Sequence, residues 1–489
     1  MTIPAVEAAS DPSDIVMMDA VSLGRAIAAR RLSCVEVMGA HLDHIEALNP
    51  AVNAIVAFQD RDGLMAQARE RDDEVRRGEI VGPLHGFPFA VKDLASVRGI
   101  RSTSGSPILK DFVPTEDALF VERLRAAGAI FIGKTNTPEF GKGSHTYNPV
   151  YGVTRNAYDQ TRSAGGSSGG AAVALALRMV PLADGSDYGG SLRNPAGWNN
   201  VFGFRTSFGV VPAAGPEVWL PSMGVIGPMA RTIPDLALLL SVQAGYDPRA
   251  PLSVEGDGAR FLEPLEADFR GKRIAWLGDF GGFAPCEPGV LELCRVALKP
   301  FEALGCVVEA ALPSYPLEPV WQAQLTLRAW QAGASLLEHY NNPASRALLK
   351  PEVIFEIESG MRLSAYEVTA ASSVRSQWSA AVGRLFERYD YLAAPTAQVF
   401  PFAVEEHWPH QIAGAEMRTY HEWMKIAFLV TMSGCPSLAV PAGFSGDGLP
   451  MGLQIIAPPR QDMACLKLGF AYDAETRWTQ RRLPRLLAA

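Results

Sequence analysis

Apolar and polar positions follow two different periods along this chain, and these periods predict helices first and strands soon after. Between residues 18 and 48 the apolar positions recur at the spacing of a helix face. They predict two short helices, the second ended by Pro50. Residues 61–77 are densely charged and predict an exposed helix, and the apolar residues 54–58 predict a short strand before it.

Further along, predicted strands and helices alternate in the order typical of α/β proteins. Residues 85–94, HGFPFAVKDL, predict a strand that carries Lys92. A helix over residues 116–127 and a short buried strand over 129–133 follow, which places Lys134 in a loop. Strand, helix and strand are predicted again at residues 271–277, 289–304 and 305–311.

The rest of the chain adds long helices and a hairpin without any linker. Residues 222–228 predict a compact loop and residues 233–244 a strongly apolar helix. Longer helices are predicted over residues 321–340 and 364–386, and a hairpin over 437–457. We therefore expect one domain over residues 1–489.

A glycine- and serine-rich stretch, residues 165–193, interrupts this regular pattern. It predicts a loop, a helix over 169–177, a strand over 179–183 and a glycine turn. Ser167 and Ser191 each follow a Gly-Gly pair. Glycines let backbone N–H groups approach a ligand closely, and such donors stabilise the oxyanion that forms when a nucleophile attacks a carbonyl.

Two other glycine motifs fit this stretch less well. A phosphate-binding P-loop requires Lys-Ser or Lys-Thr after its glycines, whereas Gly-Gly-Ala-Ala follows here. Residues 165–169 satisfy G-x-S-x-G, the nucleophile elbow of α/β-hydrolases. That elbow must follow a buried strand, and the preceding residues 159–163 are polar, so this motif is disfavoured.

Histidine chemistry has little support in the sequence. A Ser-His-Asp triad would need a histidine after the serine, and none of the candidates has a distinguishing neighbourhood. A metal site at His407 and His410 rests on that pair alone, and we predict no metal. The candidates by order are His339, His407, His410 and His421.

Lysine is the other base that can serve a catalytic serine. Lys92 lies in an apolar segment, where desolvation would lower its pKa toward neutrality. The competing interpretation is a lysine at a strand end that reaches water. If Lys92 is desolvated, a proton relay from Ser191 through Ser167 to Lys92 becomes feasible. Spacing alone leaves both interpretations open.

Bulk properties restrict the partners. The 44 basic and 52 acidic residues give a net charge of −8, without a basic block, so we expect no nucleic acid partner. The six cysteines form no C-x-x-C pair and suit a reducing compartment. The acidic N-terminus lacks the features of a signal peptide, and no apolar run reaches membrane-spanning length. We expect a cytoplasmic protein whose partner is a small molecule.

These motifs together resemble the amidase signature family. GGSSGG at 165–170 is followed by an apolar helix and then by D-x-G-G-S-[apolar]-R-x-P-A at 187–196. The match is long and gapless, and it extends over most of the chain. Further matching segments are GFPFAVKD at 86–93, GKTNTPEF at 133–140, GPMARTIPDLALLL at 227–240 and DGLPMGLQIIAPP at 447–459.

The resemblance implies a fold and a role for each motif residue. The fold would be a single α/β/α domain with a large mixed, mostly parallel central sheet, a catalytic core over 80–245 and a variable pocket region over 315–425. Ser191 would be the acylated nucleophile, Ser167 the bridging serine after a cis peptide bond, and Lys92 the base. No metal or cofactor is implied. Backbone amides of Tyr188, Gly189, Gly190 and Ser191 would form the oxyanion hole. Ser168 would support the relay by hydrogen bonding in the same network, and Asp187 and Arg193 would be the supporting pair that fixes the turn.

The implied activity is hydrolysis of the C–N bond of a small, apolar or aromatic amide. Hydrolysis of an aryl carbamate or of an ester is implied as well. A urethane hydrolase, a non-catalytic binding protein of the same fold and an amidotransferase A-type subunit remain alternatives. A homodimer is compatible with the sequence, which does not fix the oligomeric state. Aromatic residues expected at the pocket are Tyr147, Tyr188, Trp198, Trp321, Trp330 and Trp408.

Overall fold

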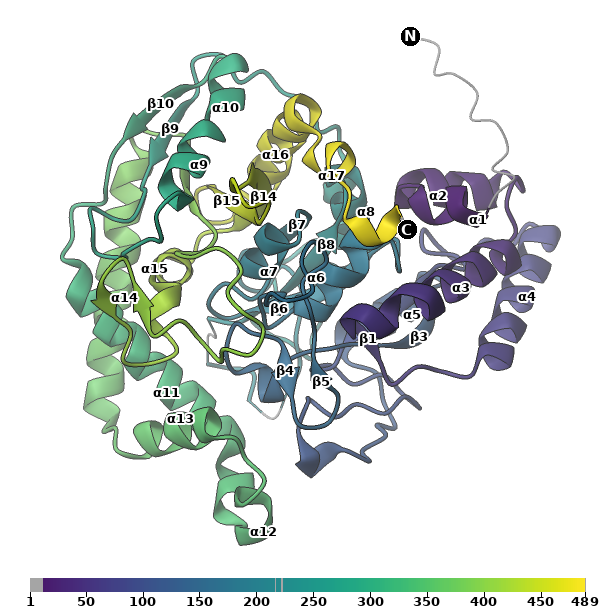
Figure 1. Cartoon of the computed structure of the whole chain (residues 1–489), viewed down its shortest axis with the longest axis horizontal. Helices are drawn as coiled ribbons and strands as arrows, with labels where there is room; N and C mark the ends of the chain where they lie inside the picture. Colours follow the sequence, from purple (N-terminus) through teal and green to yellow (C-terminus); the bar gives the residue numbers. More distant parts are fainter. Residues whose placement is uncertain (1–11, 216, 221–222, 489) are drawn as a thin grey trace.

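The structure is a computed structural model that describes residues 12–215, 217–220 and 223–488 (Figure 1). Its centre is an eight-stranded mixed sheet with the strand order β10-β9-β11-β15-β14-β7-β8-β6. The predicted α/β class with a large mixed sheet is confirmed. The strands are β6 (Ala183–Asp187), β7 (Phe202–Arg205), β8 (Val225–Ala230), β9 (Arg273–Trp276), β10 (Val307–Ala310), β11 (Tyr391–Pro395), β14 (Ser437–Phe444) and β15 (Pro450–Ile456).

The prediction that this sheet is mostly parallel is wrong. Among the described pairings of this eight-stranded sheet, only β10 with β9 and β9 with β11 are parallel. The other five pairings of the sheet are antiparallel. Consecutive strands such as β14 and β15 are joined by a short turn, and a short turn can connect only antiparallel neighbours.

A second, smaller sheet carries Lys92. Its order is β1-β3-β2, where β1 is Ile55–Val56, β2 is Pro88–Lys92 and β3 is Ile130–Thr135. The strands β2 and β3 run parallel, with Lys92 opposite Thr135. All five residues of β2 are buried, so the lysine ends a strand that has no solvent-facing side.

Helices cover the two sheets and extend beyond them. In Figure 1 the N-terminal helices (purple) lie at one side of the molecule, and the helices α11 to α14 (green) lie at the other. The helices are α1 (Pro12–Met17), α2 (Ala20–Ala28), α3 (Cys34–Val52), α4 (Arg61–Arg77), α5 (Leu119–Ala126), α6 (Gly169–Ala176), α7 (Arg193–Trp198), α8 (Ile233–Gln243), α9 (Val290–Val296), α10 (Lys299–Ala303), α11 (Leu317–Asn341), α12 (Pro343–Arg346), α13 (Pro351–Met361), α14 (Ala365–Phe386), α15 (Lys425–Ser433), α16 (Asp462–Thr476) and α17 (Trp478–Arg481).

Most of the predicted helices are confirmed, and their ends follow from capping. The helix over 61–77 is α4, where the Asp60 side chain accepts from the N–H of Gly63 and Gly78 closes the C-terminus in the left-handed region. The prediction that Pro50 ends the second helix is wrong. Helix α3 continues to Val52, which is buried, and ends at Asn53 with φ 53°.

Three local predictions are wrong, the first because a helix end occupies the predicted strand and the other two because strand pairing extends into predicted loops. The strand expected over 179–183 lies at 183–187, since the N–H of Met179 bonds to Ala174 O and closes the end of α6 instead. Lys134 is inside β3 and not in a loop. Of the loop expected over 222–228, residues 225–228 belong to β8, which pairs with both β6 and β7, and residue 222 lies outside the described residues.

Helix α6 sits at the centre of the molecule and positions the serine-rich loop. All eight of its residues are buried. A Cβ atom at Gly170 would lie 2.4 Å from the backbone nitrogen of Asn136, so only glycine allows this approach to the chain after β3. The helix thereby holds the loop that precedes it against both sheets.

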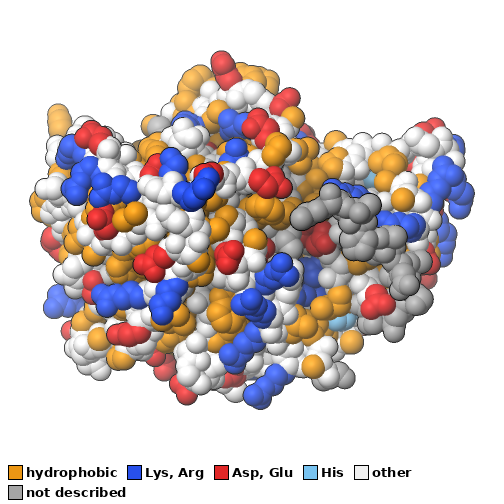
Figure 2. All heavy atoms as spheres, turned by 90° about the horizontal axis from the view of Figure 1, so that it is seen from above, with side chains coloured by type: hydrophobic (Ala, Val, Ile, Leu, Met, Phe, Trp, Pro, Cys, Tyr) orange, Lys and Arg blue, Asp and Glu red, His pale blue; other side chains and the backbone are white. Residues whose placement is uncertain are grey.

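The surface carries charges of both signs. On the face drawn in Figure 2, Lys and Arg side chains are interspersed with Asp and Glu. None of the helices in the described part of the chain combines the length and apolar character that a membrane span requires.

Candidate active site

The two serines of the glycine-rich stretch lie on loops that line one pocket. Ser167 precedes α6, and Ser191 lies between β6 and α7. The pocket has a volume of about 310 Å³, and both serines line it. Ser167 is buried, whereas Ser191 is partly exposed.

The peptide bond between Gly166 and Ser167 is cis. Two hydroxyl groups hold the loop on its N-terminal side. Ser144 Oγ donates to the carbonyl oxygen of Gly166 at 2.6 Å, and Thr146 Oγ1 donates to that of Gly165 at 2.8 Å. Both carbonyls therefore have hydrogen-bond partners, which fix the backbone directly before Ser167.

Lys92 reaches the serine loop from the smaller sheet. Its Nζ lies 2.8 Å from Ser167 Oγ, 2.8 Å from Ser168 Oγ and 3.0 Å from Ser186 Oγ. A protonated ammonium group would donate to all three hydroxyls. A neutral amine has two N–H bonds and one lone pair, so it would donate to two of them and accept from the third.

Burial favours the neutral form of this lysine. Lys92 is only 1% exposed, and burial lowers the pKa of its amine from 10.5 to about 7, against the opposing effect of Asp184 and Asp187. Asp184 is also a direct partner, since its Oδ1 accepts from the backbone N–H of Lys92 at 3.0 Å. The burial of Asp184 raises the pKa of its carboxyl to about 6.

Lys134 is a second buried lysine, and its contacts differ. Its Nζ donates to Ser102 Oγ at 3.0 Å and to the carbonyl oxygen of Ala95, and it lies 3.8 Å from Asp93 Oδ1. Burial lowers its pKa to about 8. Lys134 does not line the serine pocket, so Lys92 is the buried lysine that contacts the serine loop there.

Asp187 organises the turn that carries Ser191. Its carboxylate accepts two hydrogen bonds from Arg193, both 2.9 Å long, and further ones from the N–H groups of Gly190 and Leu192 at 2.8 and 3.1 Å. Arg205 Nη1 lies 3.2 Å from the same carboxylate. Burial opposes the charged form, but the two arginines outweigh it and hold the pKa of Asp187 below its usual range.

The glycines of this turn meet two different requirements. A Cβ at Gly189 would lie 2.0 Å from the ring of Phe428, and Gly190 has φ 114°, which favours glycine. The N–H of Gly190 already donates to Asp187. Among the described residues, the amides of Tyr188, Gly189 and Ser191 have no hydrogen-bond acceptor, so three of the four amides expected at the oxyanion hole are left as donors for a ligand.

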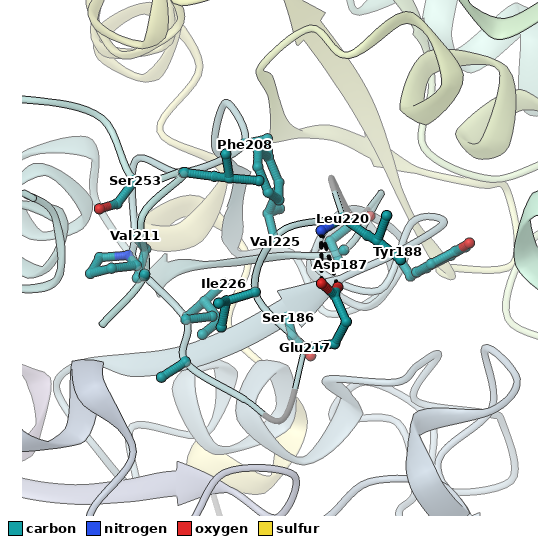
Figure 3. Close-up of a pocket in the computed structure, with 18 residues that line it drawn as sticks. Ser186, Asp187, Tyr188, Phe208, Val211, Glu217, Leu220, Val225, Ile226 and Ser253 are labelled. Atoms are coloured by element: carbon teal, nitrogen blue, oxygen red, sulfur yellow. Dashed lines mark hydrogen bonds between the residues drawn. The ribbon is translucent and has the colours of Figure 1, made fainter. Parts of the chain in front are cut away.

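A second cavity lies on the other side of Tyr188. Its volume is about 320 Å³, and it shares Ser186 and Tyr188 with the serine pocket. Figure 3 shows Ser186, Asp187 and Tyr188 at the end of β6, and its dashed lines mark the hydrogen bonds that the backbone N–H of Leu220 donates to Glu217 in the same lining. The end of β6 therefore forms a wall between two cavities.

The aromatic residues expected at the pocket are distributed over several places. Tyr188 lines the serine pocket, whereas Tyr147 and Trp408 line a separate cavity of about 710 Å³. Trp198 and Trp321 are buried in the core, and Trp330 packs against it, so the expectation is wrong for these three. Apolar, uncharged polar and charged residues contribute the rest of the serine pocket, namely Leu94, Phe140, Lys142, Arg328, Gln331, Ala332, Ser335, Met424 and Phe428, with Gly141 and Gly143.

The four candidate histidines lie elsewhere. His407 stacks on Tyr147, His339 stacks on Phe140, and His410 packs beside Trp408. In the part of the chain that the structure describes, none of them hydrogen-bonds to Ser167 or Ser191. His421 Nε2 instead contacts Arg328 and Glu356.

Sequence reasoning missed Ser186 and Asp184 as partners of Lys92. Both lie on β6, two residues apart, and therefore on the same face of that strand. The spacing of two residues between Asp184 and Ser186 is the pattern that could have identified them as neighbours on one strand face. The strand predicted over 179–183 ends before both residues and therefore does not include them.

The comparisons with known proteins agree with this architecture. The model of the Amidase family matches residues 36–466. An acylamidase of Rhodococcus erythropolis is 35% identical over 468 residues, covering 95% of this chain and 97% of that protein. The A-type subunit of the glutamyl-tRNA(Gln) amidotransferase of Thermosynechococcus vestitus is 34% identical, and the match covers 94% of this chain and 98% of that protein.

Solved structures give the same result. The crystal structure of a bacterial aryl acylamidase of the amidase signature family superimposes with a TM-score of 0.88 and 30% identity, over 96% of this chain and 98% of that one. A peptide amidase from Stenotrophomonas maltophilia gives 0.80 and 27%, over 97% and 99%. The chain belongs to the amidase signature family. It is an amidohydrolase, an enzyme that cleaves C–N bonds.

Proposed function

We propose that this enzyme hydrolyses small linear amides through an acyl-enzyme on Ser191, with Ser167 and Lys92 as the proton relay. The observation that carries the proposal is the contact between Lys92 Nζ and Ser167 Oγ at 2.8 Å, made by a buried lysine whose pKa is lowered to about 7. An amine of that pKa is neutral in a large fraction of molecules at neutral pH and can act as a general base.

In the first half-reaction, neutral Lys92 takes the proton of Ser167 while Ser167 takes that of Ser191. Ser191 Oγ then attacks the carbonyl carbon of the amide. Among the described residues no hydrogen bond joins the two serine hydroxyls, and we expect this bond to form with substrate in place. The N–H groups of Gly189 and Ser191 would receive the oxyanion.

Collapse of the tetrahedral intermediate breaks the C–N bond. The proton returns from Lys92 through Ser167 to the leaving nitrogen, so the amine departs neutral and the acyl group stays on Ser191. In the second half-reaction, water gives its proton to the same relay and attacks the acyl carbon. Release of the acid then restores the Ser191 hydroxyl and neutral Lys92.

Aryl amides are the substrate class that we propose to test first. The serine pocket has an apolar wall formed by Leu94, Phe140, Met424 and Phe428, which suits an aromatic ring. Two relatives are an acylamidase and an aryl acylamidase. The same relay would cleave an aryl carbamate or ester, and cleavage of carbamates as a main activity remains a prediction.

The test combines covalent labelling with a substrate panel. We expect a fluorophosphonate probe to label the wild type at Ser191 and the wild type to hydrolyse aryl amides. Ser191→Ala and Lys92→Met should lower kcat/KM by at least about 10³-fold. Ser314→Ala, at an exposed serine, serves as the matched control.

Two outcomes would contradict the proposal. One is near-normal turnover by a folded Ser191→Ala protein. The other is an absence of labelling in the wild type, which would favour a non-catalytic binding protein. The panel should include aryl carbamates, esters, peptide amides and glutamine, because hydrolysis of glutamine alone would favour an amidotransferase A-type subunit.

A further inference from the structure

The pocket beside Ser191 has a charged part that the catalytic relay does not use. The charged side chains that line it are Lys142 and Arg328, and no Asp or Glu among the described residues lines it. Lys142 follows the loop after β3, and Arg328 lies on α11. Two cations from distant parts of the chain thus meet at one pocket.

Several contacts hold the Arg328 side chain in place beside the serine pocket. The residue is 7% exposed, and its Nε donates to Glu356 Oε1 at 2.7 Å while Nη2 donates to Tyr420 Oη at 3.1 Å. Its guanidinium lies over the rings of Tyr188 and Phe428, 5.2 and 5.6 Å from their centroids. Its third nitrogen, Nη1, has no hydrogen-bond partner among the described residues.

Lys142 shares the carboxylate that pairs with Arg328. Its Nζ lies 3.3 Å from Glu356 Oε2, and its side chain is 14% exposed. Burial lowers the pKa of the Lys142 amine, and the charge of Glu356 opposes that shift. His421 also contacts Glu356, but burial lowers the pKa of its imidazole and favours the neutral form. The carboxylate of Glu356 is therefore the shared counter-ion of two cations, Arg328 and Lys142.

The other charged groups nearby do not balance the excess positive charge of Arg328 and Lys142 inside the pocket. Lys350 Nζ donates to the carbonyl oxygen of Lys142 at 2.6 Å and adds a further cation. Glu139 Oε2 accepts from the backbone N–H of Lys350, and Glu352 accepts from Tyr147. Neither of these carboxylates lines the serine pocket. A buried charge without a counter-ion is costly, so an anion entering the pocket would be strongly favoured.

We propose that Arg328 and Lys142 bind a carboxylate carried by the substrate outside its scissile C–N bond. The substrate class is thereby narrowed to amides that combine an apolar segment with a carboxylate. Arg328 Nη1 and the unused N–H bonds of Lys142 supply charge-assisted hydrogen bonds to it. This inference rests on the proposed function of Ser191, and it concerns selectivity rather than catalysis.

The test compares two matched pairs of substrates. One pair is glutaric acid mono-4-nitroanilide and its methyl ester; the free acid of this pair carries its charge on the acyl side. The other is N-acetyl-4-aminobenzoate and its methyl ester, which place it on the amine side. We expect the carboxylate of at least one pair to have a kcat/KM about 10- to 100-fold above that of its ester.

Two variants assign that preference to the two cations. Arg328→Met and Lys142→Met should each reduce the ratio of carboxylate to ester about tenfold, and Lys110→Met, at an exposed lysine, should leave it unchanged. Using two separate variants keeps the test valid if one of them does not fold. A wild type without preference in either pair, or an unchanged ratio in both pocket variants, would overturn the inference.

A binding measurement separates this inference from the proposed function. Titration calorimetry of Ser191→Ala with the same four compounds reports recognition without turnover. Tighter binding of a carboxylate than of its ester would support the cationic subsite even if no substrate were cleaved, whereas equal binding in both pairs would contradict it. Failure of wild-type labelling at Ser191 would instead count against the proposed function alone.

Discussion

Replacing Lys92 by methionine should abolish activity and at the same time stabilise the fold at neutral pH. Burial lowers the pKa of this lysine from 10.5 to about 7. Since a tenfold change in an equilibrium constant corresponds to about 1.4 kcal/mol, desolvation of the amine costs the folded state at most about 5 kcal/mol at pH 7. Methionine fills similar space and has no charge to desolvate.

Lost hydrogen bonds offset part of that gain. The amine contacts the hydroxyls of Ser167, Ser168 and Ser186, and a hydrogen bond of this kind contributes about 0.5 to 1.5 kcal/mol net. We therefore expect Lys92→Met to raise the free energy of unfolding at pH 7 by about 1 to 3 kcal/mol. Lys110→Met, at an exposed lysine, should change it by less than about 0.5 kcal/mol.

The pH dependence has a definite sign. Between pH 7 and 10.5 the unfolded chain holds a proton on Lys92 that the folded protein has released, so the stability of the wild type rises with pH over this range. The unfolding free energy of the methionine variant relative to the wild type should fall by about 2 to 3 kcal/mol from pH 7 to pH 9, so that most or all of its advantage is lost at pH 9. Urea unfolding followed by tryptophan fluorescence at both pH values measures this. A difference between wild type and variant that does not change with pH would refute the lowered pKa.

Three further predictions concern the surroundings of the relay. Asp184→Asn removes a charge that raises the pKa of Lys92, so the acidic limb of the pH profile of kcat/KM, expected near pH 7 in the wild type, should move to lower pH; an unchanged limb would contradict this. Asp187→Asn leaves two buried arginines without their counter-ion and should cost about 3 to 5 kcal/mol of unfolding free energy, seen as a lower urea midpoint. Gly189→Ala should lower kcat/KM about 100-fold because its Cβ would displace the ring of Phe428, and Phe428→Leu in the same chain should restore part of the loss. Equal activities of the single and double variants would count against a steric cause.

The sequence was most informative where chemistry is local. The helix over 61–77 and the hairpin over 437–457 follow from periodicity, capping and a short turn, and the structure confirms both. The glycine-rich stretch predicted a turn that could stabilise an anion, because glycines leave backbone amides accessible. The resemblance then related it to Lys92, which lies 75 residues before Ser167 and 2.8 Å from it in space.

Features that depend on long-range pairing could not be predicted in this way. The direction of the strands in the large sheet depends on which elements become neighbours, and no local pattern encodes that. Lys142, Arg328 and Glu356 come from three separate segments, and the local sequence around each of them gives no reason to expect a buried charge. Their burial appears only when α11 and α13 pack beside the loop after β3.

Lys92 and Ser191 are held by different sheets, so the proposed proton relay would depend on how the two sheets lie relative to each other. Lys92 ends a strand of the three-stranded sheet, and Ser191 follows the edge strand of the eight-stranded one. A displacement of about 1 Å between the sheets would interrupt proton transfer while each sheet kept its own hydrogen bonds. On warming, hydrolytic activity should therefore be lost at temperatures where far-ultraviolet circular dichroism still shows the full secondary structure.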